Sequence, residues 1–342
     1  MTEVVILLSL PPFHQSGDAC SLWYNSENDR NREVLMVRRW WAVLILGVWL
    51  MGCQPRSTYP KVHLQVAEGN PVVDVERASG KLPLRVAVAA VISPRATFDI
   101  YSPLLDYLAA RLDRPVELLQ RPTYAEINEL IRTGQADIGF VCGGAFVEGE
   151  RDGYMELLAV PQIDGKSTYQ AYVVVRAESP YQSLEDLRGN TFAFTDPLSN
   201  SGHLYIQYRL AEAGETPETF FEHTIYTFSH DNSIHAVAQG LVDGATVDSL
   251  VYQSLLQDEP LLAEQLRVVE QSPPMGIPPV VVHPALDSDL KATLQQALLS
   301  MHQDTQGKDA LTVLRMERFL PPNPAAYEDI RRMSREVRDW EP

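Results

Sequence analysis

The chain has 342 residues, enough for two ordinary domains or one large one. Hydrophobic residues make up 45% of it and charged residues 21%, proportions that exclude wholesale disorder. Its 28 Lys and Arg residues stand against 45 Asp and Glu residues, which gives a formal net charge of −17. Because this charge repels a polyanion and no Lys/Arg cluster offsets it, nucleic-acid binding is excluded as a main function.

The segment that begins at Met36 has the pattern of an export signal. Two arginines precede an unbroken apolar run from Trp40 to Met51, which is within the ~7–15 residues of a signal-peptide core and short of the ~20 needed to span a bilayer. The run ends on Leu-Met-Gly-Cys, which resembles a lipobox, so Cys53 is predicted to be lipidated. The alternative is a buried hairpin or helix with an incidental cysteine. We expect a membrane-anchored lipoprotein on the periplasmic or cell-surface side.

This signal divides the N-terminal part of the chain. Residues 1–35 show no periodicity and precede the positive segment, so we expect a non-native extension ahead of a true start at Met36. Residues 36–53 form the predicted signal peptide. Residues 54–83 are polar and punctuated by Pro and Gly, which is typical of a flexible tether.

Strands and helices alternate from Leu84 onward. Apolar runs predict strands at 84–92, 115–121, 137–141, 191–195, 223–229 and 242–247. Helices are expected at 98–111, 123–134, 145–150, 183–188, 202–213, 231–240 and 248–257, the second of them opened by a capping box at Thr123 and Glu126. Two longer strands are expected at 167–179 and 267–284. After Pro284 we expect helices only, at 287–303, 308–316 and 324–338.

Repeated strand–helix–strand units predict an α/β fold with largely parallel sheets. The simplest architecture is two lobes, with the chain crossing from one to the other at each of the two long strands. Residues 84–170 with 275–342 would form lobe 1, and residues 175–270 would form lobe 2. A ligand is expected between the lobes, where the carboxyl ends of strands face the N-termini of helices.

The strongest local signal is the segment TDPLSNSG at 195–202, which follows a strand and opens a helix. Small hydroxyl side chains and a glycine allow backbone N–H groups to converge there, and the helix dipole adds positive potential. The segment therefore predicts an oxyanion site, and its candidate ligand-binding residues are Ser199, Asn200, Ser201 and Gly202. The alternative is an ordinary helix cap with a turn.

Five further residues are candidates for lining the same cleft. His230 lies in FSHDNS between a strand and a helix, and Asp248 lies at the carboxyl end of strand 242–247. Tyr101 and Tyr124 lie near helix starts that follow strands, and Cys142 follows strand 137–141. Capping or packing is the competing interpretation for the histidine and the tyrosines.

No catalytic or cofactor signature accompanies these residues. Three cysteines cannot form a disulfide framework, and Cys142, the one expected to remain free, has no paired His/Asn signature. No HExxH, CxxC, Walker or GxGxxG pattern occurs. We expect no enzyme activity, no cofactor and no metal.

Taken in order, DPLSNSGHLYIQYRLAEAG, FSHDNSIHAVAQGLVDGATVDS and SPPMGIPPVVV resemble the phosphate/phosphite/phosphonate-binding proteins of ABC transporters, across about residues 84–330. The resemblance implies a monomeric, two-lobed type II periplasmic binding fold with two crossover strands as a hinge. Such a receptor closes on a small oxyanion and delivers it to a permease. The family's Ser-Thr-Ser-Gly anion loop corresponds to 199–202, with Asn200 in place of threonine, and its histidine corresponds to His230.

The sequence thus predicts a solute-binding lipoprotein for phosphonate, phosphite or phosphate. One alternative is a sensory protein that presents the anion to a membrane histidine kinase, and another is an enzyme on the same scaffold. Where aminophosphonate binders carry a carboxylate on the second crossover, this chain has Gly276-Ile277-Pro278. We therefore expect no site for a ligand ammonium group.

Overall fold

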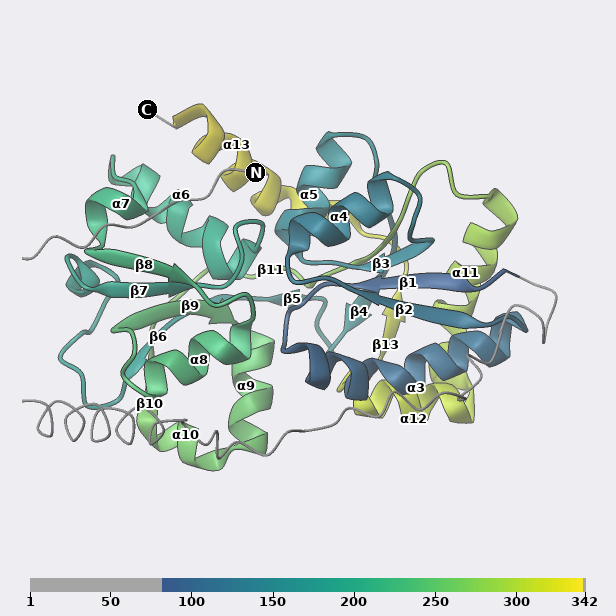
Figure 1. Ribbon diagram of the computed structural model, residues 1–342, viewed down its shortest axis with the longest axis horizontal. Coiled ribbons are helices and arrows are strands. Elements are labelled where there is room, and N and C mark those ends of the chain that lie inside the picture. The colour runs from purple at the N-terminus through teal and green to yellow at the C-terminus, as the bar shows by residue number, and fades with distance from the viewer. Residues whose placement is uncertain (1–81, 341–342) are drawn as a thin grey trace, which may run out of the picture. The chain divides into compact units, whose positions relative to one another are not determined.

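The computed structural model describes residues 82–340 (Figure 1). The predictions for residues 1–81, which include the N-terminal extension, the signal peptide and Cys53, lie outside this range, as does nearly all of the tether. Within 82–340, no helix is both long and apolar enough to cross a membrane.

Lobe 1 is built on a six-stranded sheet in the order β13-β4-β12-β3-β1-β2. Its strands are β1 (Leu84–Val88), β2 (Val116–Gln120), β3 (Ile138–Phe140), β4 (Glu156–Gln162), β12 (Val280–Val282) and β13 (Arg318–Leu320). Strand β1 runs parallel to β2 and β3, whereas β12 and β13 pair antiparallel with their neighbours.

Helices cover both faces of this sheet because its strands are apolar on both sides. In β1, Ala87 packs toward one core, whereas Val86 and Val88 pack toward the other. The first core holds α4 (Tyr124–Arg132) and α5 (Gly143–Arg151), and the second holds α3 (Pro94–Leu112), α11 (Ser288–Ser300) and α12 (Thr305–Val313). The predicted capping box is confirmed: Thr123 accepts from the Glu126 N–H, and Glu126 accepts from the Thr123 N–H.

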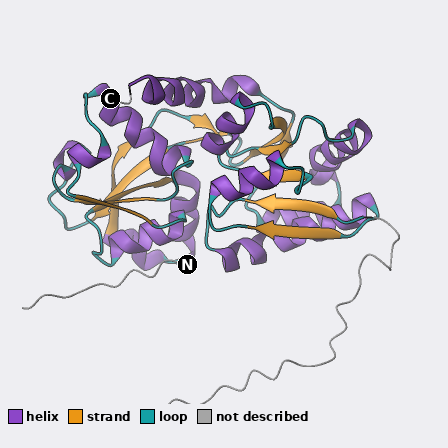
Figure 2. Cartoon of the chain, turned by 45° about the horizontal axis from the view of Figure 1, so that its top comes forward, coloured by secondary structure: helices purple, strands orange, loops and turns teal. Residues whose placement is uncertain are grey.

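Lobe 2 is built on a five-stranded sheet in the order β10-β6-β9-β7-β8. Its strands are β6 (Ala171–Arg176), β7 (Thr191–Phe194), β8 (His223–Tyr226), β9 (Gly244–Asp248) and β10 (Leu266–Gln271). The helices around it are η1 (Glu185–Leu187), η2 (Asn200–Leu204), α6 (Tyr205–Glu212), α7 (Pro217–Phe220), α8 (His230–Ala238), α9 (Ser249–Asp258) and α10 (Pro260–Gln265). Figure 2 shows the strands of the two sheets as two separate groups surrounded by helices.

The two predicted long strands are interrupted in the structure. Residues 167–179 contain β5 (Thr168–Tyr169) and β6, and residues 267–284 contain most of β10, then β11 (Met275–Gly276) and β12. Strands β5 and β11 pair with each other as a separate antiparallel ribbon between the two sheets. The interruptions of the second strand fall at Pro273-Pro274 and Pro278-Pro279, where the backbone has no N–H to donate to a ladder.

Three details of the predicted architecture need correction. Both sheets are mixed rather than largely parallel, because β6 and β12 enter their sheets directly from the crossing ribbon and run antiparallel to their neighbours. The C-terminal part is not helical throughout: β13 joins the edge of the lobe 1 sheet beside β4. The predicted helix at 183–188 is a single turn, η1. The fold class is confirmed as α/β with two lobes.

The C-terminal helix contacts helices of both lobes. After the turn η4 (Pro324–Tyr327), helix α13 (Glu328–Trp340) begins. Arg331 forms a bidentate ion pair with Glu150 of α5, at 2.7 and 2.9 Å. The neighbouring Arg332 donates to the Tyr208 hydroxyl of α6 at 2.9 Å and lies over its ring. Helix α13 therefore links lobe 1 to lobe 2.

Candidate functional site

The segment between β7 and α6 is a tightly closed loop. Ser199 caps the helix that follows, and its Oγ accepts a hydrogen bond from the Gly202 N–H at 3.0 Å. The Gly202 carbonyl accepts from the Thr195 N–H at 3.0 Å. A Cβ at Gly202 would lie 1.8 Å from Thr195 Oγ1, so only glycine fits. In this conformation the Gly202 N–H donates to Ser199 within the loop and is not available to a ligand. This agrees with the interpretation of the segment as a helix cap.

His203, which the sequence analysis did not single out, joins this loop to strand β8 through hydrogen bonds of both ring nitrogens. Its Nδ1 lies 2.8 Å from the Pro197 carbonyl and its Nε2 lies 2.9 Å from the Tyr226 hydroxyl. Because a carbonyl can only accept, Nδ1 carries the proton and Nε2 accepts from Tyr226. Burial lowers the pKa of His203 to about 4, so the ring is neutral at pH 7.

The loop also contacts the N-termini of two lobe 1 helices. The Asp196 carboxylate accepts from the Tyr124 N–H at 3.0 Å and from the Leu198 N–H at 2.8 Å. The Asn200 N–H points at Cys142 Sγ, 3.3 Å away. Burial raises the pKa values of Asp196 and of the Cys142 thiol. Two of the predicted lobe 1 candidates, Tyr124 and Cys142, therefore meet the predicted anion loop.

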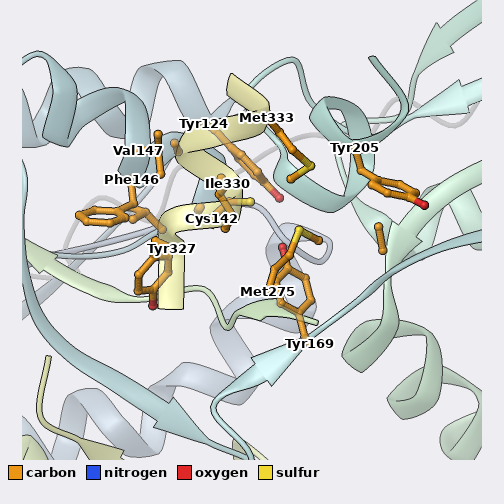
Figure 3. Close-up of a cluster of buried hydrophobic side chains, with 14 of the residues drawn as sticks. Tyr124, Cys142, Phe146, Val147, Tyr169, Tyr205, Met275, Tyr327, Ile330 and Met333 are labelled. Carbon is orange, nitrogen blue, oxygen red and sulfur yellow. The ribbon is translucent and has the colours of Figure 1, made fainter. Parts of the chain in front are cut away.

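Asn200 reaches the crossing ribbon as well. Its side-chain Nδ2 donates to the Tyr169 hydroxyl at 2.9 Å and to Met275 Sδ at 3.3 Å, and these two residues face each other in the β5–β11 pair. Figure 3 shows the hydroxyl ends of Tyr124 and Tyr169 pointing toward the same region, beside Met275. Burial raises the pKa values of both phenols well above 10, so both hydroxyls keep their protons.

His230 and Asp248 are paired where the strands β8 and β9 end. The Asp248 N–H donates to His230 Nδ1 at 2.9 Å, so the neutral ring carries its proton on Nε2. Burial lowers the pKa of His230 to about 3. Asp248 caps α9 by accepting from the Leu250 and Val251 N–H groups, and burial raises its pKa to about 7. The His230 N–H donates to the Val91 carbonyl of lobe 1 at 3.0 Å.

Several buried polar atoms in this region have no hydrogen-bond partner. Within the described part of the chain there are seven such side-chain atoms, and five belong here: Tyr124 OH, Thr195 Oγ1, Asn200 Oδ1, Ser201 Oγ and Ser229 Oγ. Folded proteins rarely leave such atoms unpaired, because each costs ~1–3 kcal/mol. Their concentration where the lobes meet makes this region the candidate ligand-binding site.

Tyr101 does not join this group. It lies inside α3, and its ring packs edge-on against Phe140 at 5.3 Å, in the core on the other face of the lobe 1 sheet. Burial raises its pKa to about 12. Its position agrees with the packing interpretation. Among the described residues, no group of three or more His, Cys, Asp or Glu side chains could hold a metal ion.

The sequence analysis missed some residues of this region. Thr195 and Asp196 lie within the quoted loop segment and Ser229 lies within FSHDNS, so both motifs already contained them. Tyr169 and Met275 had no motif. Their only signal was their position on the two predicted crossovers.

Comparison with known proteins identifies the family of this chain. The family model described as the periplasmic substrate-binding protein of phosphonate ABC transporters matches residues 86–327. The "Phosphate-import protein PhnD" of Mycolicibacterium smegmatis is 31% identical over 50% of this chain and 57% of its own length. The "Phosphonates-binding periplasmic protein" of Escherichia coli is 24% identical over 62% of this chain and 64% of its own length. The chain thus spans less than two thirds of these curated relatives.

A solved structure shows the same fold. The binding-protein component of an ABC phosphonate transporter from Pseudomonas aeruginosa superposes with a TM-score of 0.72, covering 76% of this chain and 88% of that one at 24% identity. The family match extends over nearly all of the described residues and includes both lobes and the region where they meet. This chain therefore belongs to the family of periplasmic substrate-binding proteins of phosphonate ABC transporters and has the type II periplasmic binding fold.

Proposed function

We propose that this protein captures a small tetrahedral oxyanion, a phosphonate, phosphite or phosphate, between its lobes and delivers it to an ABC permease. The observation that carries the proposal is the set of five unpartnered buried polar atoms at the meeting of the lobes. Its family is one of transport proteins rather than enzymes. The site defined here offers hydrogen bonds and no nucleophile–base pair.

Neutral donors can hold such an anion. The hydroxyls of Tyr124, Ser201 and Ser229 each have a proton to donate, and the Tyr169 hydroxyl, which accepts from Asn200, has one as well. His230 adds its Nε2–H. Hydrogen bonds to a charged group are worth ~1.5–3 kcal/mol each, so four or five of them can offset the desolvation of a small anion.

Cross-lobe hydrogen bonds support closure around the ligand. The pairs Asp196–Tyr124 and His230–Val91 each join one lobe to the other through a backbone group. Strands β5 and β11 are two residues long, and each leads within one to three residues into a strand of a sheet. Rotation at this ribbon can therefore separate the lobes while each sheet stays intact. We propose a monomer that opens and closes at this ribbon.

We further propose that Cys53 carries a lipid that anchors the protein to the membrane, on the basis of the arginine pair, the apolar run and the Leu-Met-Gly-Cys sequence. Mass spectrometry of the membrane fraction should find the mature chain beginning at an acylated Cys53, and Cys53→Ser should leave an unprocessed precursor. A mature, unacylated chain beginning at Met1 would contradict the assignment.

Calorimetric titration tests the binding function. At least one of methylphosphonate, phosphite and phosphate should bind. At ~100 times its Kd, that ligand should raise the free energy of unfolding of the protein by ~2.7 kcal/mol. Tyr124→Phe should weaken that ligand at least ~10-fold, because it removes a buried donor. Tyr101→Phe is the matched control, since Tyr101 packs on the other face of the sheet, and it should leave affinity unchanged. Failure of all three anions to bind would reject the proposal.

A further inference from the structure

We propose that Asn200 makes the site selective for a tetrahedral anion that keeps a proton on one of its oxygens, and so for phosphonate, phosphite or phosphate over sulfonate. The inference rests on the proposed function and adds a chemical criterion for the head group. It depends on one atom, Asn200 Oδ1, which is buried and has no partner.

The orientation of the Asn200 amide follows from its neighbours. Met275 Sδ lies 3.3 Å from one end of the amide, and a thioether can only accept a hydrogen bond. That end must therefore be the NH₂ group, which also donates to the Tyr169 hydroxyl. The opposite amide orientation would place a carbonyl oxygen against the sulfur. Asn200 is thus fixed with Oδ1 on the side away from the crossing ribbon.

No protein group satisfies this oxygen. The residue is fully buried, its backbone N–H goes to Cys142 Sγ, and neither the Tyr124 hydroxyl nor the Ser201 hydroxyl pairs with Oδ1, although both have a proton to give. An amide oxygen cannot donate. A partner for Oδ1 must therefore bring its own proton, and a ligand with a P–OH group can supply one.

The chemistry of the anions then separates them. A phosphate or phosphonate head loses its last proton near neutral pH, with a second pKa of about 6 for phosphate esters, so a P–OH form is readily available. A sulfonate is a strong acid and presents only bare oxygens. Bound beside Oδ1, a sulfonate would place two acceptors together in a buried site, whereas a P–OH would donate to Oδ1.

The proton is expected on the head group rather than on a distant ligand ammonium. The Asn200 amide donates to the Tyr169 hydroxyl, which points toward the same region as the Tyr124 hydroxyl in Figure 3. Oδ1 of the same amide therefore lies among the groups proposed to surround the head. The titratable groups facing this region are Tyr124 of α4, Cys142 at the start of α5, Tyr169 of β5, and Asp196, His230 and Asp248 of lobe 2. Of the two carboxylic acids among them, Asp196 accepts a backbone N–H on each oxygen, whereas Asp248 uses one oxygen for its helix cap, so Asp248 is the acid that could share a proton with the ligand.

The test compares methylphosphonate with methanesulfonate, which differ in the head atom and in the ability to keep a proton. Titrating the full chain at pH 7, we expect methylphosphonate to bind at least ~100-fold tighter. Asn200→Thr restores the residue type of the family's loop, removes the carbonyl acceptor, and should reduce this ratio at least ~10-fold. Ser201→Ala is the matched control: it removes a hydroxyl that can serve either anion, so it should weaken both and leave the ratio unchanged.

If Asn200→Thr does not fold, proton uptake on binding tests the inference instead. Methylphosphonate binding at pH 8.5, measured in buffers of different ionisation enthalpy, should take up about one proton per ligand. Uptake should persist in Asp248→Asn, which removes the competing acid while keeping a helix cap.

An unchanged selectivity ratio in folded Asn200→Thr overturns the inference and leaves the proposed function standing. Loss of proton uptake in Asp248→Asn overturns it in the same way, as does wild-type protein that binds methanesulfonate as tightly as methylphosphonate. If methylphosphonate, phosphite and phosphate all fail to bind, the proposed function itself fails and the inference fails with it.

Discussion

The carboxylate of Asp196 accepts a hydrogen bond from the backbone N–H of Tyr124 at 3.0 Å, and so joins the loop after β7 in lobe 2 to the first residue of α4 in lobe 1. An N–H at the start of a helix has no partner within the helix, and a carboxylate there is also favoured by the helix dipole. Asp196 is almost fully buried, so this bond is shielded from water. It is a specific contact that opening of the lobes would have to break.

We therefore expect Asp196→Ala to favour the open form and to weaken anion binding about 10-fold, the loss of one buried charge-assisted bond. Small-angle scattering of the ligand-saturated protein should show a larger radius than wild type. Asp243→Ala is a suitable control, because Asp243 accepts from Thr191 within lobe 2 and contacts neither the loop nor lobe 1 through these bonds. If both variants bind equally well, the Asp196 bond does not contribute to closure.

Two buried histidines predict a loss of stability in acid. The pKa of His203 is lowered from 6.5 to about 4 and that of His230 to about 3, so the unfolded chain takes up protons before the folded one does. The histidine contribution to stability is therefore complete above pH 6.5 and falls as the pH drops toward 4, by up to ~3 kcal/mol for each histidine. Asp248 contributes with the opposite sign over this range, so the histidine part is measured against the Asp248→Asn background. Urea unfolding between pH 7 and 4.5 measures this change.

Replacing His203 by glutamine should flatten that pH dependence, because the titrating ring is gone. Replacing His223, an exposed histidine on β8, should leave the pH dependence as in wild type. A steep loss of stability that survives in both single variants and in the His203/His230 double variant would assign the acid sensitivity to other groups.

Asp248 predicts the opposite pH dependence. Burial raises its pKa from 3.8 to about 7, so its ionisation favours the unfolded chain and stability is lost as the pH rises from about 4 to 7. Asp248→Asn keeps the helix cap and should raise the free energy of unfolding of the ligand-free protein by ~2–4 kcal/mol at pH 8, with little effect at pH 4. Asp287→Asn, at the exposed cap of α11, should change little at either pH.

The sequence predicted most of the elements of both lobes because their strands are continuous apolar runs bounded by turn residues. It missed the strands β4 and β13 and the short helices α7 and α10. It also merged the crossing segments, where prolines interrupt the ladder. In the site, the loop at 195–202 was evident from its composition. Tyr169 was not, because its role depends on pairing with Met275 across a long sequence separation.

The two tyrosines show why a candidate list from sequence is incomplete. Tyr101 and Tyr124 were both predicted near a helix start after a strand. Helix α3 begins at Pro94 rather than near 98, which places Tyr101 in its second turn facing the core around Phe140. Tyr124 is the first residue of α4 and reaches the meeting of the lobes. Because α3 begins one turn earlier than predicted, Tyr101 is a packing residue, whereas Tyr124 lies at its predicted helix start and belongs to the candidate site.

Helix α13 should act as a link that opening breaks on one side. Its bond to lobe 1, Arg331–Glu150, is bidentate and partly buried, whereas its bond to lobe 2, Arg332–Tyr208, is more exposed and rests on one hydrogen bond and a cation–π contact. The Arg332–Tyr208 contact is worth ~0.5–1 kcal/mol, so opening of the lobes should break it before the Arg331–Glu150 pair.

Arg332→Ala should therefore favour the open form, weaken anion binding by about 3- to 5-fold and leave stability within ~1 kcal/mol of wild type, since a contact worth ~0.5–1 kcal/mol corresponds to such a factor. Arg335→Ala is the matched control, because Arg335 is an exposed arginine of the same helix that pairs with Glu328 within α13 and not with lobe 2. It should change neither affinity nor radius. Calorimetry and scattering with and without ligand measure both effects. If the two variants have the same affinity and the same radius, the Arg332–Tyr208 contact does not restrain opening of the lobes.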